Sequence, residues 1–228
     1  MARPRTIHDF FGFPQALFDV QYPAPGLPGL ADEVAEVAHP DYVGADLDGW
    51  GLDHGAWSVL VHAFPAADIP VVQLSINAQK PLDYHLELGA RLSRLRERGV
   101  LLLGSGNVVH NLRAIDWQQP DAGFDWARRF DEHARQVLTE RPGDAASLIA
   151  HADYRMAAPT PEHFLPVLYL AVAAAAAGTP AETLVDGYAF GSRSMTSYGV
   201  GTACPDTDAN LAGSAPLSEE VPADESNI

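Results

Sequence analysis

The pattern of apolar and polar positions along the chain indicates an α/β protein. Residues 69–77 (IPVVQLSIN) are apolar and rich in β-branched side chains, which is typical of a buried strand, and residues 100–103 (VLLL) form a second such run. Between them, residues 82–99 carry apolar side chains at helical spacing and end in an Arg-rich turn before Gly99. A strand, a helix and a strand with short connections predict a βαβ unit with parallel strands.

Further stretches extend this pattern on both sides. Residues 27–38 predict a short helix with Pro28 near its start, and residues 125–140 predict an amphipathic helix. Residues 182–199 alternate weakly and predict a terminal strand with loops. We therefore expect one α/β domain over residues 1–203, with a central, mostly parallel sheet flanked by helices.

The most apolar run of the chain predicts a buried helix within residues 158–178 (APTPEHFLPVLYLAVAAAAAG). Thr160 can be its N-cap and Pro161 its first helical residue, and Pro166 is then expected to kink it. His163 would lie in the first turn, where the positive end of the helix dipole disfavours an imidazolium ion. A neutral imidazole of this kind is what a metal ion binds, although a lone histidine there can also be a surface side chain.

Composition narrows the range of partners. The chain has 14 basic and 30 acidic residues and a formal net charge of −16, which argues against nucleic acids and membrane surfaces as partners. Cys204 is the single cysteine, so an intrachain disulfide is excluded and a reducing, cytoplasmic location is expected. Residues 204–228 contain acids, no base and almost no large apolar residue, and they predict a disordered acidic tail.

A Gly-Ser-Gly turn followed by a histidine is the first candidate for chemistry. Gly104 and Gly106 follow the apolar run, but a third glycine and a Gly-Lys-Ser/Thr motif are absent, which leaves a turn with close backbone approach rather than a phosphate loop. His110 then lies where ligands bind in parallel sheets, beyond the carboxyl end of a strand. His54 stands between an acid and a glycine near two tryptophans. The residues alone indicate a metal-dependent α/β enzyme with dispersed histidine ligands, and each histidine could equally be structural.

Taken together, six stretches resemble the class III extradiol ring-cleaving dioxygenases of the DOPA 4,5-dioxygenase type. The resemblance is collinear over nearly all of the predicted domain. The stretches are TIHDFFGFPQALFDVQYPAPG (6–26), WGLDHGAWSVL (50–60), DIPVVQLSIN (68–77), GSGNVVHNLR (104–113), TPEHFLPVLY (160–169) and GSRSMTS (191–197). The resemblance implies a single α/β domain on a central sheet. It also implies insertion of O2 into a catechol ring, such as that of DOPA, beside the two hydroxyls rather than between them.

The resemblance also implies a cofactor and site residues. The cofactor is a divalent metal, Fe(II) in the working mechanism and Zn(II) in some descriptions, which holds the small-molecule catechol, with O2 as co-substrate. His110 would be an active-site residue, either metal-associated or an acid/base, and His163 a metal-site residue. His54 would line the same pocket and help with proton transfer or substrate binding, and His8 would face the substrate as well. The oligomeric state, a homodimer included, stays open.

The chain departs from the family pattern at its start. Two family motifs that carry primary metal ligands, a Gly-His-Gly-Ser-Pro-like loop and Ser-Ala-His-Trp, do not occur, so the N-terminal strands of the family fold are expected to be missing. Three explanations compete: a start assigned downstream of the true one, a truncated non-catalytic relative that keeps the pocket, or ligands supplied by a partner or duplicate chain. Two histidines alone should bind a metal weakly. A metallohydrolase is the least favoured class, because Asp53 is the only nearby acid that could serve as its base.

Overall fold

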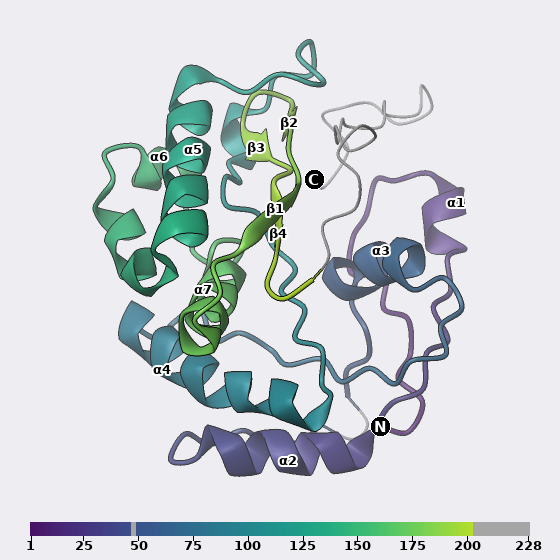
Figure 1. Ribbon diagram of the computed structural model, residues 1–228. Helices are drawn as coiled ribbons and strands as arrows, with labels where there is room; N and C mark the ends of the chain where they lie inside the picture. Colours follow the sequence, from purple (N-terminus) through teal and green to yellow (C-terminus); the bar gives the residue numbers. More distant parts are fainter. Residues whose placement is uncertain (47–48, 203–228) are drawn as a thin grey trace. The chain divides into compact units, whose positions relative to one another are not determined.

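The computed structural model describes residues 1–46 and 49–202 of the chain (Figure 1). These residues form two compact units, one of residues 1–75 and one that begins at residue 76. Each unit is described by itself below. The acidic tail predicted at 204–228 lies outside the described residues, and the single domain expected over the rest of the chain stays a prediction.

In its described residues, the first unit contains three helices and long irregular segments around an apolar core. The helices are α1 (Gln15–Phe18), α2 (Pro28–Ala38) and α3 (His54–Ala63). The helix predicted at 27–38 is thus confirmed, with Pro28 in its first turn, where a missing N–H costs nothing. The indole Nε1 of Trp57 donates to the carbonyl of Ile7 at 2.8 Å and ties the N-terminal segment to α3. The core residues are Tyr22, Ala24, Leu52, Trp57 and Leu60.

The second unit is mainly helical. Its helices are α4 (Leu82–Leu92), η1 (Ser93–Arg98), η2 (Leu112–Ala114), α5 (Asp125–Glu140), η3 (Pro142–Ala150), α6 (Tyr154–Ala157) and α7 (Leu165–Ala177). The predictions at 82–99 and 125–140 are confirmed, the first as an α-helix that tightens into a 3-10 helix before Gly99. Helix α5 buries one face, as its amphipathic pattern requires. Helix α7 contacts α4 and η3, which accounts for its nearly uniform apolar sequence.

The start of α7 differs from the prediction. The helix begins at Leu165, not at Pro161, and Pro166 lies in its first turn. The physical reason is that a proline ring clashes with the carbonyl of the fourth preceding residue, so a helix that began at Pro161 would be strained at Pro166. Placed in the first turn instead, Pro166 needs no N–H partner and produces no kink. His163 therefore lies in the turn just before the helix, and its predicted place in the first helical turn was wrong.

The C-terminal part of the second unit forms two small antiparallel pairs of strands. Strand β1 (Glu182–Val185) pairs with β4 (Ser197–Gly199), and β2 (Tyr188–Ala189) pairs with β3 (Arg193–Ser194) (Figure 1). This confirms strand structure within residues 182–199, where four short strands replace the single terminal strand that the sequence predicted. The chain reverses between β2 and β3 at Gly191, whose φ of 78° suits a residue without a side chain.

The predicted βαβ unit is not present among the described residues. Residues 71–77 and 100–106 carry no strand assignment, so the strands predicted at 69–77 and 100–103 were wrong in this structure, and no central parallel sheet is seen. The physical reason is that a strand forms only when its backbone is hydrogen-bonded to a neighbouring strand. An apolar, β-branched sequence favours the extended conformation but does not provide the neighbouring strand. The described residues thus combine helices with small antiparallel sheets. None of their helices has the length and apolar character that crossing a membrane requires.

Candidate active site

The segment that carries His110 is fixed by backbone hydrogen bonds to the C-terminal hairpin. The amide of Ser194 donates to the carbonyl of Val109 at 3.0 Å, and the amide of Asn111 donates to the carbonyl of Ser192 at 3.1 Å. The hydroxyl of Ser192 donates to the carbonyl of Asn111 at 2.8 Å. Val109 is fully buried, so the imidazole of His110 projects from a rigid support.

The glycines before His110 serve close backbone packing, as the sequence predicted. A Cβ on Gly106 would lie 2.3 Å from the carbonyl oxygen of His163, and one on Gly104 would lie 3.3 Å from Pro166. The amide of Asn107 donates to the carbonyl of His163 at 2.9 Å. The small residues of the Gly-Ser-Gly stretch therefore allow the backbone at His163 to pack directly against the segment that carries His110.

The structure brings His110 and His163 into direct contact. Their rings stack with centroids 3.6 Å apart and an angle of 11° between the planes. Both residues are half-buried and lie in the second unit. We call His110 and His163 the histidine pair.

The surroundings of the histidine pair keep His110 neutral. Burial, then the neighbouring His163 and then the Arg193 guanidinium lower the pKa of His110 to about 4, against a smaller opposing effect of Glu162. Burial works to raise the pKa of Glu162, but hydrogen bonds from the Thr160 hydroxyl and from its own backbone N–H, and the charge of His163, hold it below its ordinary value. Near neutral pH the pair thus contains an uncharged imidazole at His110 beside a carboxylate, and the lone pair of that imidazole can accept a proton.

The histidine pair alone does not fit a metal ion. An ion bound equally by two parallel rings 3.6 Å apart would lie about 1.8 Å out of each ring plane, half the separation, whereas a nitrogen lone pair lies in the plane and bonds at about 2.0–2.1 Å. In the part of the chain that the structure describes, no group of three or more His, Cys, Asp or Glu side chains could hold a metal. Two imidazoles in this orientation therefore supply neither the geometry nor the number of ligands for a complete site.

A second histidine of interest, His54, forms a dyad with an acid in the first unit. Its Nδ1 lies 2.8 Å from the Asp9 carboxylate, which also accepts from the His54 backbone N–H at 3.0 Å. Burial would raise the pKa of Asp9, but these hydrogen bonds lower it below its ordinary value. With the side chain half-exposed and Nδ1 fixed, the ring presents Nε2 outward from the Asp9 side. Sequence reasoning missed Asp9, although it follows His8 directly in TIHDF.

His8 lies in the aromatic core of the first unit. Its Nε2 lies 2.9 Å from the carbonyl of Val20, so the ring donates there in the matching tautomer. Its ring contacts those of Phe10, Phe18 and Trp57, with centroids 5.5–6.1 Å apart. This environment gives His8 a structural role within its unit, and its substrate-binding role stays a prediction.

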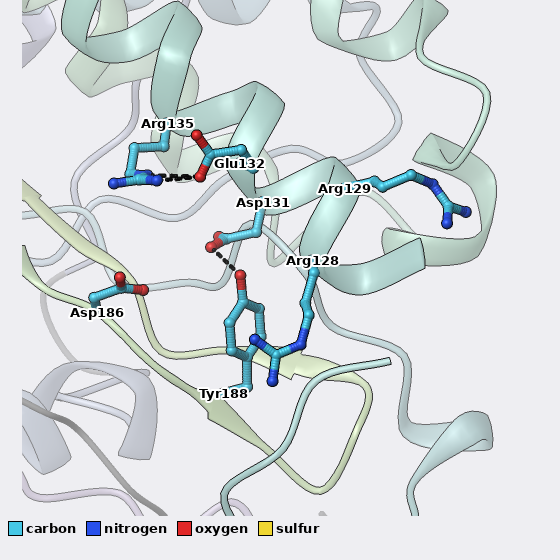
Figure 2. A pocket seen from close by; sticks show the side chains of 7 residues that line it. All are labelled: Arg128, Arg129, Asp131, Glu132, Arg135, Asp186 and Tyr188. Carbon is cyan, nitrogen blue, oxygen red and sulfur yellow. Dashed lines mark hydrogen bonds and ion pairs between the residues drawn. The ribbon is translucent and has the colours of Figure 1, made fainter. Parts of the chain in front are cut away.

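A polar cavity in the second unit lies over α5 and the hairpin (Figure 2). It has a volume of about 430 Å³ and is lined by Arg128, Arg129, Asp131, Glu132, Arg135, Asp186 and Tyr188. Its three arginines already have partners: Arg128 stacks over Tyr188, Arg129 pairs with Asp153, and Arg135 pairs with Glu132. Figure 2 shows the hydroxyl of Tyr188 directed at Asp131. These internal pairings make the cavity a structural junction rather than a ligand site.

Adding a methyl group at Gly106 tests the packing under the histidine pair. We expect Gly106→Ala to destabilise the protein by about 1–3 kcal/mol, because its Cβ would collide with backbone and cannot be accommodated by a side-chain rotation. Urea unfolding measures the change. Gly143→Ala is the matched control, because a Cβ there meets nothing within 4 Å. Equal stability of the two variants would show that the close approach at Gly106 is not required.

Comparisons with known proteins agree with the resemblance seen in the sequence. The family model described as the catalytic LigB subunit of aromatic ring-opening dioxygenase matches residues 2–201. The chain is 45% identical over 205 residues to "4,5-DOPA dioxygenase extradiol" of Escherichia coli (strain K12), which covers 88% of this chain and 75% of that protein. It is 36% identical over 197 residues to the protein of the same name from Beta vulgaris, covering 85% and 73%.

A solved structure agrees with the sequence matches. The crystal structure of an uncharacterised protein from Escherichia coli K12 superimposes with a TM-score of 0.72 at 40% identity, covering 86% of this chain and 80% of the other. The family match spans both units and all four histidines discussed above. The chain therefore belongs to the LigB family of aromatic ring-opening dioxygenases and is an enzyme of this type.

Proposed function

We propose that this protein cleaves the ring of a catechol such as DOPA beside its two hydroxyls, with O2 as co-substrate and a divalent metal as cofactor. The observation that carries the proposal is the histidine pair, which joins two stretches of the family pattern that are far apart in the sequence. The names of the relatives from Escherichia coli and Beta vulgaris support both the reaction and DOPA as the substrate type. They favour an active enzyme over a non-catalytic relative.

His110 is the proposed acid/base of the reaction. The uncharged imidazole of His110 would accept a proton from a catechol hydroxyl. Loss of that proton would increase the electron density of the catechol ring before the catechol reacts with O2. The stacked His163 fixes the orientation of His110, and the uncharged His110 ring does not repel a cationic centre nearby.

His110 and His163 are also the proposed metal-site residues. Fe(II) is the metal expected to support the redox step, since Zn(II) cannot change oxidation state. Because the stacked rings supply neither the geometry nor the number of ligands for a complete site, this role would require the two rings to turn apart and ligands beyond those that the described residues supply. A reducing cytoplasm, which the single cysteine favours, would keep such iron in the Fe(II) state.

Oxygen uptake tests the proposed reaction directly. The chain is loaded with Fe(II) under nitrogen, DOPA is added, and O2 is then admitted while an oxygen electrode and the absorbance of the yellow ring-opened semialdehyde are followed. We expect one O2 consumed per DOPA cleaved, and no turnover with Zn(II) in place of Fe(II). Absence of O2 uptake with DOPA and with other catechols would refute the proposed function.

The His54–Asp9 dyad is proposed to assist proton transfer or substrate binding. We expect His54→Ala to lower kcat/KM for DOPA by about 10- to 100-fold, because the ring is held by Asp9 with Nε2 available to a ligand. Asp9→Asn should have a smaller effect in the same direction, since it removes the charge that orients the ring. His62→Ala, an exposed position on the same helix, is the control. Unchanged turnover in His54→Ala would end this assignment.

A further inference from the structure

The side chain of Arg193 lies beside His110 because of the strand register. His110 and Arg193 are bridge partners in antiparallel orientation, and the two backbone hydrogen bonds that define the bridge flank them rather than join them. Such a non-hydrogen-bonded pair has Cα atoms about 4.5 Å apart and places both side chains on one face. The guanidinium of Arg193 is accordingly one of the charges that act on His110.

Arg193 is a half-buried cation that has no anionic partner among the residues that the structure describes. Its Nε is inaccessible to solvent and has no hydrogen-bond acceptor among the described residues. Its guanidinium lies over the ring of Phe190, 5.0 Å from the centroid. Burial lowers the pKa of Arg193 and is the one cause of the shift. A neighbouring carboxylate would raise that pKa instead.

Comparison with Arg128 shows what is missing at Arg193. Arg128 also lies over an aromatic ring, that of Tyr188, at 4.7 Å. The Nε of Arg128 donates to the carbonyl of Gly123 at 2.9 Å, so this Nε has an acceptor within the protein. A buried guanidinium left without such an acceptor costs free energy that a bound anion recovers.

We propose that Arg193 binds the side-chain carboxylate of the catechol substrate and makes the enzyme selective for catechols that carry one. This proposal rests on the proposed function, because it places the catechol ring of the substrate at the histidine pair and the substrate carboxylate at Arg193. A planar guanidinium matches a carboxylate with two parallel hydrogen bonds, so it selects by geometry as well as by charge. The Phe190 ring behind it holds the fork in a fixed plane.

Equilibrium binding tests the proposal without turnover. Titration calorimetry under nitrogen compares 3-(3,4-dihydroxyphenyl)propionate with 4-ethylcatechol, which has the same ring and no carboxylate. We expect the first to bind about 10- to 100-fold more tightly, the range of a charge-assisted bidentate contact. Arg193→Met should remove this preference and Arg193→Lys should keep part of it, whereas Arg128→Met should leave it unchanged. Equal binding of the two ligands, or no binding of the propionate, would overturn the proposal.

A measurement on the unaltered protein covers the case in which Arg193→Met does not fold. Modification by phenylglyoxal, followed by peptide mass spectrometry, reports how accessible each arginine is. We expect 3-phenylpropionate to protect Arg193 and not Arg128, and 2-phenylethanol to protect neither. Failure of 3-phenylpropionate to protect Arg193 would contradict the proposal.

Oxygen uptake separates the failure of this inference from failure of the proposed function. Equal turnover of both catechols by the Fe(II)-loaded protein would support ring cleavage and remove the role of Arg193. A carboxylate preference in binding, with no O2 uptake on any catechol, would instead support the binding site and remove the reaction.

Discussion

Replacing His110 with alanine is expected to reduce catechol cleavage by at least about 100-fold while the protein stays folded. The imidazole is neutral, half-buried and stacked on His163, so it is held in one orientation with its lone pair available. Proton transfer by one positioned side chain contributes about 10²–10⁴-fold to a rate, and alanine removes that contribution entirely. Oxygen uptake with DOPA measures the loss, and circular dichroism establishes that the helices remain.

His133→Ala is the matched control for this experiment. His133 and His151 form another stacked pair in the second unit, with centroids 4.9 Å apart, but they lie away from the segments of the family pattern that carry the site histidines. The turnover of DOPA by His133→Ala should stay within about twofold of that of the unaltered protein. Titration with Fe(II) then divides the two roles assigned to His110: a fall in affinity of at least about tenfold in His110→Ala and His163→Ala would support metal binding. Equal turnover of His110→Ala and His133→Ala would contradict the assigned site.

The helices were the part of the fold that local sequence could predict. Residues 125–140 are helical over the predicted range, because the apolar face of this segment repeats at the helical period and buries Phe130 and Val137. Gly99 ends its helical segment with a φ of 78°, a conformation that glycine adopts without strain. These features depend on residues within a few turns of one another.

The strands could not be predicted in the same way, because pairing is not a local property. The run at 100–103 has the composition of a strand, yet Leu101 is 64% exposed and the segment has no neighbouring strand among the described residues. The prediction of where α7 begins was wrong for another reason. Two prolines five residues apart both suit the first turn of a helix, and the prediction placed Pro161 there, whereas the structure has Pro166.

The candidate site was predictable only as a set of separate histidines. The family pattern selected His110 and His163, and the structure stacks their rings, but neither periodicity nor spacing indicates that contact. Asp9 and Arg193 were missed because each lies beside a site histidine that is remote in the sequence, Asp9 beside His54 and Arg193 beside His110. A cross-strand register or a side-chain hydrogen bond between distant segments has no signature in one sequence.

Asp131→Ala is expected to destabilise the second unit by about 3 kcal/mol or more. Asp131 is 2% exposed on α5, and its carboxylate accepts hydrogen bonds from the hydroxyls of Tyr188, Ser194 and Thr196. Alanine would leave one buried and two half-buried hydroxyl donors, those of Ser194, Tyr188 and Thr196, without their acceptor. It would also detach α5 from the hairpin that positions the histidine pair, and each buried group left unsatisfied costs about 1–3 kcal/mol. Urea unfolding measures the loss. Asp186→Ala, an exposed acid on the same cavity, should change stability by less than about 0.5 kcal/mol.

The pH dependence of Asp131→Asn tests the same carboxylate through its charge. Burial raises the pKa of Asp131 and outweighs the hydrogen bonds from its three hydroxyl partners, which lower it. A carboxyl whose pKa is raised on folding contributes stability below its unfolded pKa, near 4, and loses that contribution as the pH rises through the folded pKa. The original protein should therefore lose stability relative to Asp131→Asn as the pH rises from about 4, and the variant lacks this titration. A stability difference that instead grows in favour of the original protein over this range would mean that the hydroxyls, rather than burial, dominate the carboxylate.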